Sequence, residues 1–364
     1  MHSTNLLSVF TETGIMMHRE AMIDLIKGNL LEARTEALVN TVNTVGVMGK
    51  GIALQFREAF PENYKFYQKA CKQEKVKIGK MLVFDMGHFT NPRYIINFPT
   101  KKHWKEKSKI EYIEAGLVDL KHVIHEYEIK SIALPPLGCG SGGLDWNVVR
   151  PLITRSLDNL DDVKVIIYEP VGAPRAEQIR VATEKPNMTI GRAALIYLMA
   201  HYAVIGYKFS LLEVQKLMYF LQVAGQQLKL SYVKKQYGPY AENLNHVLQH
   251  VEGHYLRGYG DRSGKASVYL LPDAAEDAEK FIEDKPDVLE KLRKVLDLVE
   301  GFETPYGMEL LSTVHWLAGE DDNVKVDPRA AVKGFEEWNQ RKRYYFKPEH
   351  IQIAWKRLHN YGWL

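Results

Sequence analysis

The chain has 364 residues, which is too long for one ordinary hydrophobic core and favours two domains. Hydrophobic residues make up 46% of it, which is enough apolar material for both domains to fold. Lys and Arg number 48 against 45 Asp and Glu, so a strong overall field is excluded and any nucleic-acid contact must come from local clusters of cations.

The two cysteines, Cys71 and Cys139, lack the spacing of metal ligands. With no signal peptide and no apolar run that could span a bilayer, we expect a cytoplasmic protein without a metal, a cofactor or a membrane contact. Residues 1–21 are polar and aperiodic, so we expect an N-terminal extension that could be disordered. Met16, Met17 and Met22 could each be the start of the protein.

Between residues 22 and 170, apolar runs of strand length alternate with segments of helical period, which predicts an α/β domain with helices on both faces of a sheet. The expected strands are Ile23 to Ile26, Ala37 to Thr41, Met81 to Phe84, Tyr94 to Phe98, Ser131 to Leu134 and Val163 to Tyr168. The expected helices are Gly51 to Phe60, Asn63 to Glu74, Lys109 to Tyr127 and Asp145 to Leu157, with Pro61 separating the first two.

Two glycine-rich loops, Gly46 to Ala53 and Pro135 to Asp145, each follow an apolar strand and precede a helix. Glycines let the backbone approach a ligand, and the N–H groups at a helix start favour an anion. Two such loops could hold a diphosphate from both sides, at the carboxyl ends of the strands. For one loop alone, the alternative is a tight turn that binds nothing.

A basic run, Pro99 to Lys107, follows the strand that ends at Phe98. The default interpretation is a solvated loop. However, the run starts at the same sheet edge as the glycine loops, so Lys101 could project toward them. Burial lowers the pKa of a lysine from its usual ~10.4, and a neutral amine can act as nucleophile or general base.

Several segments together resemble the macrodomain family, which binds ADP-ribose: Lys27 to Leu30, Val39 to Asn43, Met48 to Ala53, Gly138 to Gly140 and Tyr168 to Pro170. The two glycine loops and Thr100-Lys101 are most similar to the branch that removes ADP-ribose by means of a lysine, which includes the macrodomain of DarG antitoxins. The resemblance covers residues 22–170. It implies a mixed sheet and a DNA ADP-ribosyl glycohydrolase that releases ADP-ribose from thymine bases in single-stranded DNA.

By the same resemblance, Lys101 is the catalytic residue, Asn29 and Tyr168 lie near the adenine, and Asn43 reads a ribose. The alternatives are that Asn43 caps a turn and that Tyr168 is an ordinary aromatic at a strand end. The implied phosphate-binding residues are Gly49, Lys50, Gly51, Ile52, Ala53, Gly138, Cys139, Gly140, Ser141, Gly142, Gly143 and Leu144.

Contacts with DNA are expected from the rest of the basic run: Lys102, Lys105 and Lys107 with phosphates, and His103 or Trp104 with a base. Related glycohydrolases that act on protein carboxylates have an aspartate directly after Gly-Cys-Gly. Here Ser141-Gly142-Gly143 intervenes, and Asp145 is expected to cap the next helix. This departure favours lysine-only chemistry on DNA; a non-catalytic ADP-ribose reader and a hydrolase of ADP-ribosylated protein remain as alternatives.

After a polar linker at 171–187, residues 188–364 are predicted to form a mainly helical domain with no catalytic constellation. The expected helices are Ile190 to Ile205, Leu211 to Leu228 with Ser210 as its cap, Leu289 to Val299, Tyr306 to Leu317 and His350 to Leu358, with one short strand at Ser267 to Leu271.

Two segments of this half, Lys216 to Leu221 and Tyr237 to Ala241, resemble the C-terminal half of DarG antitoxins. That half binds and silences the DNA ADP-ribosyltransferase DarT, so the resemblance implies a DarT-type toxin as partner. Tyr219 and Phe220 have the spacing of core residues, which is the alternative. Exposed interface anchors are expected instead at Tyr237, Tyr240, Tyr255, Tyr259, Arg257 and Arg262.

Overall fold

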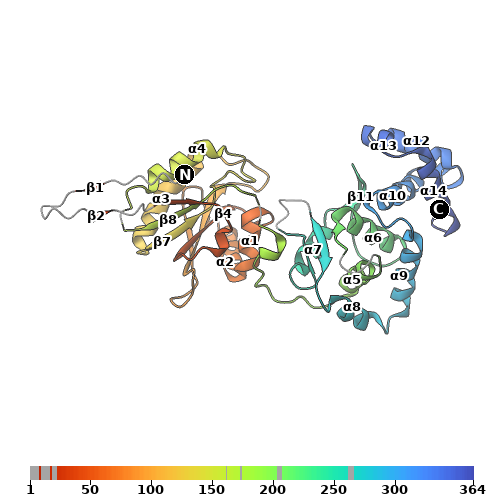
Figure 1. Ribbon diagram of the computed structural model, residues 1–364, viewed down its shortest axis with the longest axis horizontal. Helices are drawn as coiled ribbons and strands as arrows, with labels where there is room; N and C mark the ends of the chain where they lie inside the picture. Colours follow the sequence, from red (N-terminus) through yellow and green to blue (C-terminus); the bar gives the residue numbers. More distant parts are fainter. Residues whose placement is uncertain are drawn as a thin grey trace. The chain divides into compact units, whose positions relative to one another are not determined.

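The computed structural model describes residues 8–9, 17–18, 23–160, 162–172, 174–202, 207–260 and 266–364. The chain divides into two compact units, with the boundary between Thr183 and Glu184 (Figure 1). Most of the expected N-terminal extension lies outside the described residues. The exceptions are two short paired strands, β1 (Ser8–Val9) and β2 (Met17–His18).

A six-stranded mixed sheet, in the order β3-β8-β7-β4-β6-β5, forms the centre of the first unit (Figure 1). Neighbouring strands from β3 to β6 are parallel, and β5 is antiparallel to β6. The strands are β3 (Ile23–Ile26), β4 (Ala37–Asn43), β5 (Leu82–Asp85), β6 (Tyr94–Lys101), β7 (Ser131–Leu134) and β8 (Lys164–Tyr168). The predicted mixed α/β sheet is confirmed.

One predicted boundary is wrong in a way that matters: β6 continues to Lys101 instead of ending at Phe98. Pro99 lies within the strand although it has no N–H to donate. The strand tolerates it because β5 pairs only with Tyr94 to Asn97, so Pro99 lies where β6 pairs with β4 alone. Lys101 is therefore the last residue of a strand.

Four helices cover the two faces of the sheet: α1 (Gly51–Ala59), α2 (Pro61–Lys72), α3 (Ile110–Glu126) and α4 (Trp146–Leu157). Because side chains alternate along a strand, Leu38 and Val39 belong to different hydrophobic clusters. Val39 shares its cluster with side chains of α3 and α4, and Leu38 shares its cluster with Phe56 of α1. The unit also continues past Pro170, since Ile179 is buried and the Ala182 amide donates to the Glu58 carbonyl at 2.8 Å.

The second unit is mainly helical, as predicted. Its helices are α5 (Ile190–Tyr202), α6 (Leu211–Val223), α7 (Leu244–Val251), α8 (Ala274–Ile282), α9 (Pro286–Val299), α10 (Pro305–Glu320), α11 (Asn323–Val326), α12 (Pro328–Trp338), α13 (Gln340–Tyr345) and α14 (Pro348–Asn360). The Ser210 cap is confirmed, because Ser210 and Glu213 form a reciprocal capping box. α6 ends before the predicted Leu228, since Gly225 has a φ of 93° that a helix cannot continue.

The expectation of a single strand in this unit is wrong. The described residues contain β9 (Phe209–Ser210), β10 (Tyr232–Lys235), β11 (Gly238–Ala241), β12 (Leu256–Arg257) and β13 (Ser267–Leu270). β10 and β11 form an antiparallel hairpin whose turn contains Gln236 and Tyr237.

Two of the tyrosines expected at the surface are buried, which corrects that prediction. Tyr255 and Tyr259 are each 4% exposed, because their hydroxyls find partners inside the unit. The hydroxyl of Tyr255 donates to the Pro186 carbonyl, and that of Tyr259 donates to Asn245 Oδ1. Tyr219 and Phe220 also lie in the core, and Tyr237 is exposed. Arg262 lies outside the described residues.

Candidate functional site

The sheet order brings the predicted site residues to one edge. The carboxyl ends of β3, β8, β7, β4 and β6 lie at the same edge because these strands are parallel. Asn29 follows β3, Tyr168 ends β8, and Lys101 ends β6. The glycine loops follow β7 and β4, which lie between these ends. An extended ligand along this edge would pass from Asn29 over both glycine loops to Lys101.

Lys101 is half-buried, and its Nζ donates a hydrogen bond to the Ser141 carbonyl at 2.5 Å. In the register between β4 and β6 it lies opposite Asn43. Burial lowers the pKa of Lys101 from its ordinary value, since the charged form loses solvation. This arrangement places an amine with an increased neutral fraction directly beside the second glycine loop.

The position of Lys101 depends on Thr44, a residue that the sequence did not single out. The hydroxyl and the amide of Thr44 both donate to the Lys102 carbonyl, at 2.7 and 3.3 Å. These bonds hold the backbone next to Lys101 against the end of β4, just before the first glycine loop. Nothing in the sequence near Thr44 indicates this role, because its partner Lys102 lies 58 residues further along the chain.

The first glycine loop leads into α1, whose N-terminus has no side-chain cap. Lys50 occupies the cap position, and the first turn contains no acidic residue. The first N–H groups of a helix lack intrahelical partners, so those of Gly51, Ile52 and Ala53 are suited to an anion. Gly49 and the exposed Lys50 precede them, and Lys50 adds a positive charge.

Asn43 closes this loop with its own side chain. Its Oδ1 accepts from the amides of Val45 and Val47, at 3.0 and 3.3 Å, and from the Tyr67 hydroxyl at 3.1 Å. Its Nδ2 donates to the Val47 carbonyl at 2.5 Å. The turn-capping alternative is therefore what the structure contains, and a role in reading a ribose stays a prediction.

The second glycine loop offers amides of its own rather than a helix start. Asp145 caps α4 by accepting from the Asn147 amide at 2.9 Å, as predicted, so a carboxylate already occupies that helix end. Within the described part of the chain, the amides of Gly140, Ser141 and Gly142 donate no hydrogen bond. These three amides are available to a ligand, whereas those of the flanking Gly143 and Leu144 already donate to the carbonyls of Gly140 and Gly138, at 3.0 and 3.1 Å.

The glycines of this loop differ in what surrounds them. A Cβ on Gly138 would lie 2.8 Å from Leu144 Cδ1, and one on Gly142 would lie 2.1 Å from the Gly138 carbonyl oxygen. Both glycines are required by close packing inside the loop. A Cβ on Gly140 would meet no atom within 4 Å. The space beside the Gly140 Cα is therefore empty, whereas that beside the Gly138 Cα is filled by neighbouring side chains.

Cys139 lies between these glycines and is half-buried. Two effects raise the pKa of its thiol to about 11: burial, which is the larger, and the negative charge of Asp145. The thiol is therefore protonated at neutral pH, and a thiolate nucleophile is not available here.

At the opposite end of the edge, Asn29 caps a short 3₁₀ helix, Leu30–Glu32. Its Oδ1 accepts from the Leu31 amide at 3.1 Å, and its Nδ2 donates to Glu32 and to the Gln178 carbonyl. Tyr168 is buried in the hydrophobic cluster on the α1 side of the sheet. Both residues lie at the predicted edge, and each already has a structural role there.

The basic run after β6 forms an exposed loop that returns to the second glycine loop, where the Ser108 amide donates to the Gly142 carbonyl at 3.0 Å. Trp104 is 50% exposed, and its ring lies 5.4 Å from that of His103. Lys105 Nζ lies 5.0 Å from the Trp104 centroid. Lys102 and Lys107 are exposed as well. Cations and an open aromatic therefore lie directly next to Lys101.

Among the described residues, no group of three or more His, Cys, Asp or Glu side chains could hold a metal ion. No helix in the described ranges is both long enough and apolar enough to cross a membrane.

Comparison with known proteins gives a consistent result. Residues 39–153 match the Macro domain family. The chain is 51% identical over 333 residues to a DNA ADP-ribosyl glycohydrolase of Thermus aquaticus, covering 92% of each chain. It is 38% identical over 170 residues to a DNA ADP-ribosyl transferase-DNA ADP-ribosyl glycohydrolase fusion protein of Thermosipho africanus, covering 41% of this chain and 42% of that protein. The solved macrodomain of Thermus aquaticus DarG is 57% identical and covers 41% of this chain and 98% of that chain, with a TM-score of 0.40.

Proposed function

Because the chain belongs to the DarG-type family of macrodomain DNA ADP-ribosyl glycohydrolases, we propose that it removes ADP-ribose from thymine bases in single-stranded DNA. We further propose that the second unit binds and silences a DarT-type DNA ADP-ribosyltransferase. A protein that repairs modified DNA works where the DNA is, so we place it in the cytoplasm. Different observations support the function of the first unit and that of the second.

The observation that carries the first proposal is the contact between Lys101 Nζ and the Ser141 carbonyl. In this proposal the diphosphate of ADP-ribose binds between the open N-terminus of α1 and the amides of Gly140, Ser141 and Gly142. Strand order then directs the ribose that carries the DNA base toward Lys101. The adenine lies at the other end, near Asn29 and Tyr168.

The chemistry follows from the neutral form of Lys101, which burial favours. In one route the amine attacks the anomeric carbon of the ribose, the bond to the thymine nitrogen breaks, and this nitrogen takes up the proton that the amine loses. In the other route the amine takes a proton from a water that makes this attack and passes it to the thymine nitrogen. In the first route, water later releases the sugar from the lysine. Both routes require the amine lone pair, and Asp145 takes no part because it caps α4.

Recognition of DNA is proposed for the loop after Lys101. Lys102, Lys105 and Lys107 would contact phosphates, and the exposed Trp104 with His103 beside it would contact a base. This loop is joined to the second glycine loop through Ser108 and Gly142, so bound DNA would lie next to the scissile bond.

The partner proposal is supported by the Thermosipho africanus relative, in which a transferase and a glycohydrolase form one chain. Proteins that are fused in one organism commonly act together in another. The second unit here offers a large helical core and no metal cluster among its described residues, which suits a binding function.

One experiment separates the proposed activity from its alternatives. The purified protein is incubated with an ADP-ribosylated thymidine oligonucleotide and, in parallel, with ADP-ribosylated protein. Release of ADP-ribose from the oligonucleotide alone is expected. Release from protein alone would favour the protein-directed hydrolase, and binding without release from either would favour the ADP-ribose reader.

A further inference from the structure

Tyr67 of α2 lies in the interior of the first unit, against the turn that follows β4. Its side chain is fully buried and packs in one hydrophobic cluster with Val42 and Met48. Its hydroxyl shares a single proton between the Asn43 carbonyl at 2.7 Å and Asn43 Oδ1 at 3.1 Å. Burial raises the pKa of Tyr67 well above its ordinary value, so the hydroxyl keeps this proton. Tyr67 is therefore a permanent donor to Asn43.

Asn43 connects this donor to the turn at residues 43–47. Its Oδ1 accepts from the amides of Val45 and Val47, and its Nδ2 donates to the Val47 carbonyl. The oxygen and the nitrogen of the side-chain amide cannot exchange places without losing these bonds. Because the Tyr67 hydroxyl donates to the same Oδ1, it stabilises the amide in the orientation that the turn needs.

The turn also packs against α2 through apolar contacts. Met48 is fully buried, and a Cβ on Gly46 would lie 3.5 Å from Cys71 Cβ. Val45 and Val47, which alternate with these residues, are exposed. Apolar packing is non-directional, so it keeps the turn close to α2 without fixing the direction of its amides. That direction depends on hydrogen bonds.

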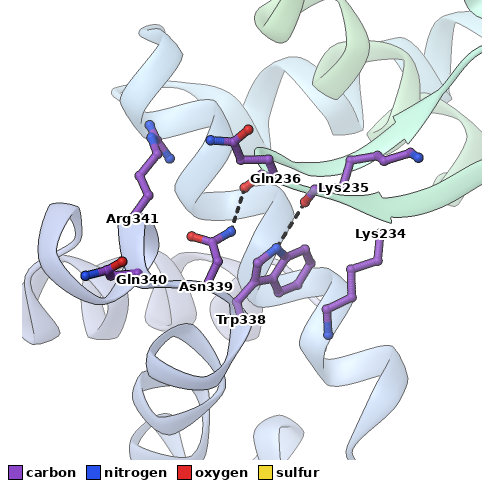
Figure 2. A pocket seen from close by; sticks show the side chains of 7 residues that line it. All are labelled: Lys234, Lys235, Gln236, Trp338, Asn339, Gln340 and Arg341. Carbon is purple, nitrogen blue, oxygen red and sulfur yellow. Dashed lines mark hydrogen bonds between the residues drawn. The ribbon is translucent and has the colours of Figure 1, made fainter.

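Side chains of neighbouring helices hold a turn in the second unit in the same way. At the tip of the β10–β11 hairpin, Trp338 Nε1 donates to the Lys235 carbonyl at 3.0 Å (Figure 2). Asn339 Nδ2 donates to the Gln236 carbonyl at 3.1 Å. Both donors come from the junction of α12 and α13, so they fix the hairpin tip from outside. Tyr67 has this relation to its own turn.

The turn held by Tyr67 leads directly into the candidate site. It is followed by Gly49, Lys50 and the open N-terminus of α1, whose first amides are suited to an anion. Lys101, by contrast, is held by the pairing of β6 with β4 and by its own bond to Ser141. A change at Tyr67 therefore acts on the anion-binding amides more directly than on the amine.

We propose that Tyr67 is a positioning residue for ADP-ribose: by holding Asn43, it keeps the first glycine loop in the shape that receives the diphosphate. The proposal rests on the diphosphate site proposed above and adds the residue that preorganises it. A loop that is already ordered binds its ligand without a further loss of conformational entropy, which raises affinity. Because Tyr67 is fully buried, it acts only through Asn43. The effect is expected in binding and not in bond cleavage.

The test compares Tyr67→Phe with Tyr64→Phe in the full chain. Each change removes one hydroxyl from α2 and keeps the ring, but the Tyr64 hydroxyl accepts from Gln68 Nε2, at 2.8 Å, within the same helix. Tyr67→Phe is expected to weaken ADP-ribose binding about tenfold in calorimetry and to raise KM for ADP-ribosylated oligonucleotide to a similar extent. Its kcat, and every constant of Tyr64→Phe, should stay within about twofold of the parent.

Hydrogen exchange measures the positioning itself, without a ligand. The amides of Val45 and Val47 should exchange faster in Tyr67→Phe than in the parent, and at the parental rate in Tyr64→Phe. Unchanged exchange of these two amides in Tyr67→Phe would show that Tyr67 does not hold the turn. Faster exchange throughout the first unit would show a purely structural role and would also overturn the proposal.

The two measurements separate this proposal from the one on which it rests. If the Val45 and Val47 amides exchange faster and ADP-ribose affinity is unchanged, the positioning role is wrong while the protein still binds its ligand. If the parent itself does not bind ADP-ribose, the diphosphate site is wrong, and the role of Tyr67 in binding is wrong with it. A lower kcat with an unchanged KM would assign Tyr67 to the alignment of Lys101 and overturn its assignment to the diphosphate.

Discussion

The Nζ of Lys101 donates to the carbonyl of Ser141 at 2.5 Å, across the strand that separates them. Lys101 ends β6, Ser141 lies in the loop after β7, and β4 runs between these two strands. Lys101 thus reaches over the end of β4, where the first glycine loop starts. The amine and both candidate phosphate-binding loops are brought together by this one contact.

Replacing Lys101 with alanine is expected to abolish hydrolysis while ADP-ribose affinity stays within roughly tenfold of the parent. An amine at the scissile bond stabilises the transition state much more than the bound ligand. Single-turnover release from modified oligonucleotide and calorimetric binding of ADP-ribose measure the two effects. Lys102→Ala is the comparison and should matter less, because the exposed Lys102 is assigned to a DNA phosphate and not to the scissile bond. Equal rates for both variants would remove Lys101 from the mechanism.

The rate of hydrolysis should rise with pH and reach its plateau below the ordinary pKa of lysine. Burial lowers the pKa of Lys101, and only the neutral amine is active, so deprotonation on raising the pH increases the active fraction. The pH profile of kcat/KM under conditions where the protein stays folded reports this pKa. A rate that falls as pH rises through this range would point to a protonated lysine acting as an acid.

Gly140→Glu is expected to eliminate measurable ADP-ribose binding in a protein that folds normally. A side chain at Gly140 meets no protein atom within 4 Å, so the carboxylate would extend into the space of the diphosphate and repel it. Gly140→Ala serves as the control and should bind within a few-fold of the parent. Circular dichroism checks the fold, and calorimetry measures affinity. Unchanged affinity of Gly140→Glu would place the diphosphate elsewhere.

Gly138→Glu, a substitution in the same glycine loop, is a poor test of phosphate binding. Its side chain would begin 2.8 Å from Leu144 and 3.1 Å from Ser108, and φ is 73°. We expect this variant to lose stability, as seen in a lower Tm, whether or not the loop binds phosphate.

Salt should weaken binding to modified DNA much more than binding to free ADP-ribose. Each phosphate contact with single-stranded DNA contributes about 0.7 to the slope of log K against log salt. Replacing Lys102, Lys105 and Lys107 together with alanine is expected to reduce that slope by about 2 for DNA and leave the ADP-ribose titration unchanged. An unchanged slope for DNA would show that this loop does not contact the phosphates.

Stability of the second unit should increase with pH over a defined range because of Lys216 and Lys342. Burial lowers the pKa of Lys216 to about 7 and that of Lys342 to about 8, against 10.5 for an exposed lysine. Between these values the unfolded state binds more protons than the folded state, so the free energy of unfolding rises with pH from about 7 to 10.5. Urea unfolding of the parent and of Lys216→Met, at several pH values in this range, measures the free energy of unfolding. The rise should be smaller in the variant, and an equal rise in both would mean that Lys216 stays charged.

The two units are expected to act separately. A fragment of residues 184–364 should bind a DarT-type transferase and block modification of DNA, although it lacks Lys101. A fragment of residues 23–183 should reverse the modification without retaining the transferase, and Lys101→Ala should end that reversal. Co-expression and pull-down measure both. Retention of the transferase by the first fragment alone would contradict this division.

The sequence by itself determined the local features of the first unit. Apolar runs, helical periods and Asp145 as a cap depend on neighbouring residues, so six strands and the main helices were found close to their observed bounds. The glycine loops and a lysine after an apolar strand also lie in short segments. For this reason both the fold class and the position of the candidate site at one sheet edge could be predicted.

Only the tertiary structure decided how these features meet, because the deciding contacts join residues far apart in the chain. Lys101 finds Ser141 because strand order places β7 two positions from β6. Asn43 is held by Tyr67, and Gly138 packs against Ser108, so their directions follow from partners that no local pattern names. In the second unit, the buried Lys216, Lys342 and Glu309 depend on partners from other elements, since Lys216 of α6 donates to the Pro239 carbonyl of the hairpin and Lys342 of α13 pairs with Glu309 of α10. Sequence patterns assign charged residues to the surface, and a desolvated charge is tolerated inside only where folding supplies its partner.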